Sequence, residues 1–228
     1  MRKEEIMFDY IFISPLGWSA HVWDKIINSM HLNQNDYEVI EFLNDSYDDI
    51  TTENIFKVLN TKFKRLSPYG TIVASSYGSI ITLLYLKKYN IQINKIILID
   101  GFEMIPNKNA LIELIPNNSV SYSSLNEYHN TLLTSEKEKN DKELLEIINH
   151  NLTYIDSSYV PKLSNKNMID YLSLFSGIEP IVIFQEVQEN IKEFFIFSNL
   201  ELPISYIKIS KLDHLLMLTK SDRILKYL

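Results

Sequence analysis

The sequence predicts an α/β fold with a mostly parallel, doubly wound sheet. Three observations lead to this prediction. Short apolar runs rich in β-branched and aromatic residues recur along the 228 residues. Their apolar character is continuous rather than alternating, which is typical of strands buried on both faces. Stretches with helical spacing lie between the runs, and strands that alternate with helices indicate parallel βαβ units.

The predicted elements follow one another regularly as far as the middle of the chain. The apolar runs interpreted as strands are 10–13, 38–42, 71–74, 95–99, 180–184 and 205–209. The stretches with helical spacing are 23–30, 52–66, 80–89 and 215–228. Between the fourth and fifth runs the chain is far longer than a simple crossover requires. We therefore predict a single domain over residues 1–228, with an insertion at 103–177 that is either a helical surface decoration or a lid over an active site.

Composition excludes several classes of function. The net charge is −7 and no basic stripe is present, so we expect no nucleic-acid partner. The chain has no cysteine, which excludes disulfides, thiolate metal sites and a cysteine nucleophile. Acidic residues interrupt the apolar start of the chain, and no apolar stretch reaches membrane-spanning length. We therefore expect a soluble, cytoplasmic protein without a membrane partner, and the lack of typical ligand spacings predicts no metal and no cofactor.

The clearest motif is the segment from Thr71 to Ser79, TIVASSYGS, which the helical stretch IITLLYLKKY follows. A buried strand runs into a turn in which Ala74 and Gly78 stand two positions before and after Ser76. Small residues at these positions avoid clashes in a sharp turn that exposes the serine hydroxyl. The N-terminus of the following helix favours developing negative charge. The pattern predicts Ser76 as a catalytic nucleophile.

A second loop follows the first predicted strand, in the segment ISPLGWSAHVW from Ile13 to Trp23. A backbone N–H group in such a loop helps to bind the oxyanion that forms when a nucleophile attacks an acyl group. We predict that Leu16 supplies one N–H donor. Tyr77, which directly follows the predicted nucleophile, is expected to supply the other.

Five histidines are candidates for the general base: His21, His31, His129, His150 and His214. Only His214 follows a late predicted strand and precedes a C-terminal helix. An imidazole is suited to this role because its pKa lets it take up and return a proton near neutral pH. We predict His214 as the base, expect a capping role for His21, and place His129 and His150 in the insertion.

The acid that orients the imidazole has two candidates. Asp100 ends the predicted strand KIILID, and a buried strand end supplies the fixed position that holding one imidazole tautomer requires. Glu189 follows the run PIVIFQEVQ, which would be a later strand. We favour Asp100 and keep Glu189 as the alternative. Asp213 is the direct neighbour of His214, and neighbours in sequence rarely have the geometry that this role requires.

Taken together, these motifs resemble those of the α/β-hydrolase superfamily. The segment PYGTIVASSYGSIITLLYLKKYNIQINKIILIDGF resembles the core of the thioesterase domains that release products from nonribosomal peptide and polyketide synthases. The segment KISKLDHLLMLTKSDRILKYL resembles their C-terminal histidine segment. The resemblance covers residues 10–100 and 178–228, and it implies Asp100 as the third member of a triad with Ser76 and His214. The loop LGWSAHVW also resembles that of pimeloyl-carrier-protein methyl esterases.

The chain departs from the superfamily pattern at two places. Ser14-Pro15 stands where the superfamily usually has His-Gly, and Ala74 replaces the usual first glycine of the turn. Three functions are therefore considered. The favoured one is a serine hydrolase that cleaves or transfers an acyl group from a thioester through an acyl-enzyme on Ser76. The alternatives are a small carboxylesterase and a hydrolase-fold binding protein that has lost catalysis.

The acyl or peptidyl group of the favoured substrate is expected to arrive on a carrier protein. Carrier proteins are usually acidic, and a chain of net charge −7 cannot attract one by its overall field. Docking would require a local cationic patch. Lys87, Lys88 and Lys95, which flank the helix after Ser76 and the next strand, are the candidates.

Overall fold

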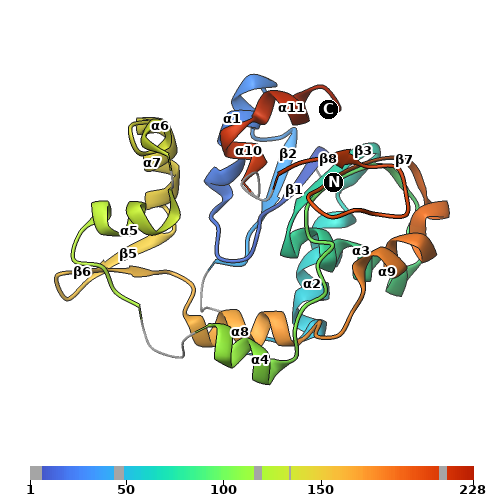
Figure 1. The fold of residues 1–228 in the computed structure, drawn as a ribbon. Helices are drawn as coiled ribbons and strands as arrows, with labels where there is room; N and C mark the ends of the chain where they lie inside the picture. The colour runs from blue at the N-terminus through green and yellow to red at the C-terminus, as the bar shows by residue number, and fades with distance from the viewer. Residues whose placement is uncertain (1–6, 44–48, 116–119, 134, 211–214) are drawn as a thin grey trace, which may run out of the picture.

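The computed structural model describes residues 7–43, 49–115, 120–133, 135–210 and 215–228. Within these ranges six strands form one sheet, and each neighbouring pair in it runs parallel (Figure 1). In order across the sheet the strands are β2 (Tyr37–Ile40), β1 (Phe8–Ile13), β3 (Leu66–Ser75), β4 (Ile93–Ile99), β7 (Ile191–Ser198) and β8 (Ile207–Lys208). The chain passes from β1 outward to β2 and then back to β3, so the strand order reverses between β1 and β3. Open α/β sheets bind ligands at the carboxyl ends of the strands at such a reversal.

Helices cover both faces of the sheet because successive strand residues point to opposite faces. Ile72 and Ala74 of β3 belong to one buried cluster, whereas Val73 between them belongs to the other. The first face carries α2 (Thr52–Phe63), α3 (Tyr77–Tyr89) and α9 (Pro180–Val187). The second carries η1 (Ala20–Trp23), α1 (Asp24–Ser29), α10 (Leu216–Thr219) and α11 (Ser221–Leu225). Among the described helices, none is both long enough and apolar enough to cross a lipid bilayer.

The predicted fold class is confirmed, and one predicted strand is wrong. Residues 180–184 form the first turns of α9, with Pro180 at the first helical position, where proline is favoured. A short apolar run cannot be assigned to strand or helix by periodicity alone. The strand lies further along, in β7, between the short helix η2 (Gln188–Asn190) and the segment that leads to β8. Lys192 and Glu193 near its start interrupt the apolar pattern on which the strand prediction depends.

The long segment between β4 and α9 contains several helices, and it also contains a β-hairpin that the sequence analysis did not predict. Its elements are α4 (Lys108–Leu114), α5 (Leu125–Leu132), α6 (Glu136–Lys139), α7 (Lys142–Asn149), β5 (Leu152–Ile155), β6 (Ser158–Pro161) and α8 (Asn165–Ser173). The hairpin β5–β6 is a separate antiparallel sheet. Leu111 of α4 and Tyr171 of α8 pack in the core of the first face, whereas Leu144 and Ile148 of α7 pack in the core of the second. The segment therefore contacts both layers of the molecule.

Candidate active site

Ser76 lies in the turn between β3 and α3. Its backbone has φ 53° and ψ −118°, a region that residues with a side chain rarely adopt. Its N–H group donates a hydrogen bond to the carbonyl oxygen of Ile99 at 2.8 Å, which ties the turn to the neighbouring strand β4. Strained backbone of this kind is concentrated at functional sites, where the surrounding structure holds it in place.

Two glycines allow the backbones around this turn to approach one another closely. A Cβ atom on Gly78 would lie 2.7 Å from the carbonyl oxygen of Ile13, at the end of β1. A Cβ atom on Gly101 would lie 2.3 Å from the carbonyl oxygen of Ser76, and Gly101 has φ +88°. Both distances are shorter than real Cβ contacts, so each position requires glycine. The turn is therefore fixed from the loops after β1 and β4.

A cavity of about 450 Å³ opens at this edge of the sheet. Four residues predicted for the site line it: Leu16, Ser76, Tyr77 and Asp100. Ser75 pairs with Ile99 in the β3–β4 register, so Ser76 and Asp100 occupy adjacent positions on neighbouring strands. Neighbouring strands lie about 4.8 Å apart. The structure thus brings the predicted nucleophile and the favoured acid to the same cavity.

Asp100 occupies the first position after β4 with φ 58°, and only 4% of its surface is exposed. Aspartate and asparagine adopt this left-handed region more readily than other residues with a side chain. The N–H group of Asp100 donates to the carbonyl oxygen of Phe197 at 2.7 Å, which joins it to β7. The carbonyl oxygen of Ile99, in the same peptide group, accepts a hydrogen bond from Ser76 N–H at 2.8 Å. The backbone that carries this carboxyl group is therefore held from the β3 side and from the β7 side.

The loop after β1 is fastened to the next strand and to the first helix. Ser14 N–H donates to the carbonyl of Ile40 at 2.9 Å, and Gly17 N–H donates to that of Phe42 at 3.1 Å. The indole Nε1 of Trp23 donates to Ser14 Oγ at 3.1 Å. Ser14 thus helps to hold the segment that brings Leu16 to the cavity.

Tyr77 is the first residue of α3, where backbone N–H groups have no partner within the helix. Its side chain is buried, with ring contacts to Phe42, Tyr171 and Phe175. Burial, and then the nearby Tyr171, raises the pKa of Tyr77 well above its ordinary value, so the phenol is neutral at every physiological pH. The ring therefore anchors the start of α3 beside the cavity, which Tyr77 lines.

The remaining sequence-predicted residues lie elsewhere. Glu189 is exposed and belongs to η2, immediately before β7, so it stands at the opposite edge of the sheet from Ser76. Because β7 spans eight residues at about 3.3 Å each, this geometry removes the reason for considering Glu189 as the acid. His214 lies outside the described residues.

The three lysines considered for carrier docking are also far from the cavity. Lys87 and Lys88 are in the last turn of α3, and Lys95 is near the start of β4, so all three are on the amino-end side of the sheet. Lys87 forms an ion pair with Glu186, and Lys95 forms one with Glu193. The prediction of a docking patch from these lysines is therefore not supported by their positions.

Asn199 is a polar residue of the cavity that the sequence analysis did not predict. Asn199 directly follows β7 and lines the cavity together with Ser76 and Asp100. The signal that would have found it is a polar residue at the end of a strand. That signal was hidden because the fifth strand was placed at 180–184.

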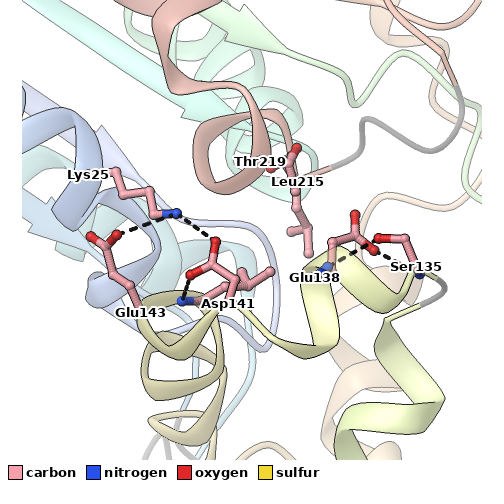
Figure 2. A network of polar contacts seen from close by, with 8 residues as sticks. Lys25, Ser135, Glu138, Asp141, Glu143, Leu215 and Thr219 are labelled. Carbon is pink, nitrogen blue, oxygen red and sulfur yellow. Dashed lines mark hydrogen bonds and ion pairs between the residues drawn. The ribbon is translucent and has the colours of Figure 1, made fainter.

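Polar contacts join the segment between β4 and α9 to the region that follows the β1 loop. Ser19 N–H donates to the side-chain oxygen of Asn151 at 2.9 Å, and the rings of His21 and His150 stack with their centroids 3.7 Å apart. In Figure 2, Lys25 of α1 reaches two carboxylates at the start of α7. Lys25 Nζ lies 3.5 Å from Oδ2 of Asp141 and 3.6 Å from Oε2 of Glu143.

The stacked histidines predict a pH-dependent contribution to stability. Burial, followed by the charges of His21 and Lys162, lowers the pKa of His150, while Asp24 and Glu146 act in the opposite direction. The unfolded chain therefore binds more protons, so stability is full above the ordinary histidine pKa of about 6.5 and falls as pH drops below it. His150→Phe keeps a stacking ring and removes the titration. The variant should show a weaker loss of stability between about pH 7 and pH 5, measured by urea denaturation.

The control for this prediction is His31→Asn. His31 is exposed and has φ 55°, a conformation that asparagine adopts readily. This variant should keep the pH dependence of the unmodified chain. An unchanged pH dependence in His150→Phe would show that the stacked pair does not couple protonation to folding.

Comparison with solved structures identifies the fold. No protein-family model matches the chain, and no curated protein matches it in sequence. A thioesterase domain from the curacin biosynthetic pathway superposes with a TM-score of 0.69 at 9% identity, covering 98% of this chain and 91% of that one. An esterase of M. tuberculosis gives a TM-score of 0.65 at 12% identity, with coverages of 97% and 84%.

A third similar structure is described as an α/β-hydrolase. The peroxisomal α/β-hydrolase of Saccharomyces cerevisiae superposes with a TM-score of 0.62 at 13% identity, covering 99% of this chain and 76% of that one. At these identities the likeness concerns the fold alone. Together with the parallel sheet and the helices on both its faces, it shows that the chain has the α/β-hydrolase fold.

Proposed function

We propose that this protein is a serine hydrolase that cleaves or transfers an acyl group from a thioester, through an acyl-enzyme on Ser76. The observation that carries the proposal is the strained turn that places Ser76 at a cavity, next to Asp100 and to the N-terminus of α3. A serine held in this way at a strand-to-helix turn is typical of nucleophilic acyl transfer.

The proposed reaction proceeds in two stages. Ser76 Oγ bonds to the acyl carbon while its proton passes to the imidazole of His214, the base proposed on sequence grounds. The N–H groups of Leu16 and Tyr77 bind the oxyanion of the tetrahedral intermediate. As the C–S bond breaks, the imidazolium returns the proton to the departing sulfur. Water then attacks the acyl-enzyme, gives its proton to the imidazole, and the acid leaves as Ser76 Oγ is reprotonated.

The carboxylate of Asp100 is proposed to act on the imidazole rather than on the substrate. By accepting a hydrogen bond from the second ring nitrogen, a carboxylate fixes the tautomer in which the other nitrogen takes the serine proton. It also stabilises the imidazolium that forms. Its buried position and its doubly held backbone suit this orienting role.

The shape and lining of the cavity support an acyl group with a substantial apolar part. Ile80 of α3, Leu111 of α4, and Met168 and Leu172 of α8 contribute hydrocarbon to its wall. Its volume of about 450 Å³ falls in the range of small-molecule sites. The curacin thioesterase domain, which has a similar fold, is the reason for naming a thioester as the acyl donor in this proposal. The carrier protein remains part of the proposal, although Lys87, Lys88 and Lys95 do not serve as its dock.

We further propose that residues 103–177 act as a lid. Three observations on this segment support the idea: it contacts both layers of the molecule, it supplies Leu111, Met168 and Leu172 to the cavity wall, and it is attached near the β1 loop by polar contacts. Closure of such a segment over a bound acyl group excludes water from the reacting atoms.

The second candidate function is ester hydrolysis with the same residues. The fold similarity to the M. tuberculosis esterase favours it as much as the curacin domain favours the thioesterase. The two differ in the leaving group rather than in the nucleophile. Kinetics on thioesters and oxygen esters of one acyl group would therefore separate them.

The experiment that tests the proposed function is covalent labelling with a fluorophosphonate, which reacts with activated serines. The unmodified protein should be labelled, and Ser76→Ala should not, because the reacting hydroxyl is gone. Ser75→Ala is the matched control, since Ser75 is the preceding residue and is fully buried. Equal labelling of Ser76→Ala and the unmodified protein would contradict the assignment, and no labelling of either would favour the binding-protein alternative.

A further inference from the structure

The described lining of the cavity carries negative charge without positive charge. Asp100 and Glu103 supply its acidic side chains, and no lysine, arginine or histidine is found among the lining residues that the structure describes. Trp18 adds an indole ring to the same lining, and the faces of such rings attract cations. A charged group that enters this cavity therefore meets surroundings that favour a cation over an anion.

Glu103 has an exposed side chain on a backbone that its neighbours hold in place. Phe102, directly before it, and Ile105, two positions after it, are buried in the core of the first face. The carbonyl oxygen of Ile105 also accepts a hydrogen bond from Gly177 N–H at 3.0 Å. Because the backbone is fixed on both sides of Glu103, its carboxylate stays at the open part of the cavity.

The carboxylate of Glu103 is available to a ligand. Within the described ranges, no ion pair and no hydrogen bond of this side chain is found. Asp170 of α8, by contrast, forms an ion pair with Lys108 of α4 at 2.7 Å. Asp100, the other carboxylate of the cavity, is assigned to the imidazole in the proposed mechanism. Glu103 is thus the carboxylate that a cationic group of the substrate can meet.

The position of Glu103 restricts how far such a cation lies from the reacting carbonyl. Three peptide units separate Glu103 from Asp100, so their Cα atoms are at most about 11 Å apart. Asp100 in turn occupies the position adjacent to Ser76 on the neighbouring strand. C–C bonds are about 1.5 Å long, so a chain of about six carbons spans most of this distance. The cation is therefore expected at the end of a short, linear acyl group.

We propose that Glu103 is a specificity-determining residue that pairs with an ammonium group at the end of a short acyl chain. The hydrocarbon between the carbonyl and the ammonium group lies against the apolar part of the cavity lining. The same carboxylate disfavours acyl groups that end in an anion. The inference rests on the proposed function and names the charge of its acyl group, whichever leaving group is attached.

The test compares two N-acetylcysteamine thioesters that have the same shape and differ in charge. One acyl group is 6-(trimethylammonio)hexanoyl, and the other is 7,7-dimethyloctanoyl, in which carbon replaces the charged nitrogen. Glu103→Gln should lower the ratio of kcat/KM for the cationic over the neutral thioester about fivefold, because it removes one exposed charge pair. Glu103→Lys should lower this ratio further, because repulsion replaces attraction. Both changes should shrink in about 0.5 M NaCl, which screens exposed charges.

The matched control is Glu113→Gln. Glu113 is an exposed carboxylate of α4 that does not line the cavity, so this variant should keep the ratio of the unmodified enzyme. Two outcomes would overturn the proposal. A ratio that stays the same in both Glu103 variants would show that this carboxylate does not meet the substrate. An equal fall in Glu103→Gln and Glu113→Gln would assign the effect to the negative field of the whole protein.

Binding measurements separate this inference from the proposed function. Calorimetry on Ser76→Ala, with and without Glu103→Gln, follows the same pair of thioesters without turnover. A charge preference in binding that depends on Glu103, with no turnover by the unmodified protein, supports the inference and contradicts the catalytic proposal. Turnover of both thioesters with a ratio that does not depend on Glu103 supports catalysis and overturns the inference.

Discussion

Replacing Asp100 with asparagine is expected to lower kcat/KM for acyl transfer by about 10³–10⁴-fold. Asparagine has the same shape but cannot hold the imidazole in the tautomer that accepts the serine proton, and it does not stabilise the imidazolium. The Asp100→Asn variant should keep its fold, because asparagine tolerates the φ of 58° that position 100 requires. Steady-state kinetics on an acyl thioester, together with urea denaturation, would separate the loss of activity from a loss of stability.

The control for Asp100→Asn is Glu189→Gln, which removes the other carboxylate considered for the same role. Glu189 is exposed at the amino edge of β7, so its replacement should change kcat/KM by less than about twofold. A large loss in Glu189→Gln and a small one in Asp100→Asn would assign the acid to a different strand and would remove the main support for Asp100.

Gly101→Ala is expected to cause the largest loss of stability among single substitutions near the site. The new Cβ would lie 2.3 Å from the carbonyl oxygen of Ser76 and 2.9 Å from its carbonyl carbon, and both of these atoms belong to the backbone. The φ of +88° adds strain for any residue with a side chain. We expect a loss of at least about 3 kcal/mol in the free energy of unfolding, measured by urea denaturation. Fluorophosphonate labelling of Ser76 should fall as well, because the turn must shift.

Gly177→Ala provides the matched comparison for this substitution. Gly177 also has a positive φ, of +73°, but a Cβ there would meet no atom within 4 Å. Its replacement should cost only the conformational strain, about 1–2 kcal/mol. The difference between the two variants measures the contact with Ser76. Equal losses in both would show that the backbone of the turn yields to the added carbon.

The turn that contains Ser76 was predictable because its determinants are local. The strand, the turn with Ser76 and the helix after it lie within one short segment. Gly78 in this segment indicates a place where another stretch of backbone lies close to the turn. Asp100 was predictable for the same reason, since it ends the next apolar run along the chain. Position at the end of a buried strand was enough to direct attention to both residues.

Other parts of the site depend on contacts between distant segments, and the sequence does not reveal these. Asn199 reaches the cavity only because β7 pairs with β4, and polar residues at the start of β7 conceal that strand. The contact between Ser19 and Asn151 joins residues 132 positions apart. No local pattern marks either partner, because both interactions arise from the packing of the whole domain.

The pairing of β3 with β4 through α3 has a consequence for how this protein can change. Ser76 and Asp100 belong to one βαβ unit of consecutive sequence, so their relative placement depends on a compact local module. Much of the apolar wall, by contrast, comes from helices α4 and α8 of a separate segment. Substitutions at Leu111, Met168 or Leu172 can reshape the cavity while Ser76 and Asp100, the proposed nucleophile and acid, keep their positions. The shape of the cavity and the placement of Ser76 and Asp100 thus depend on different segments of the chain, and each can change without the other.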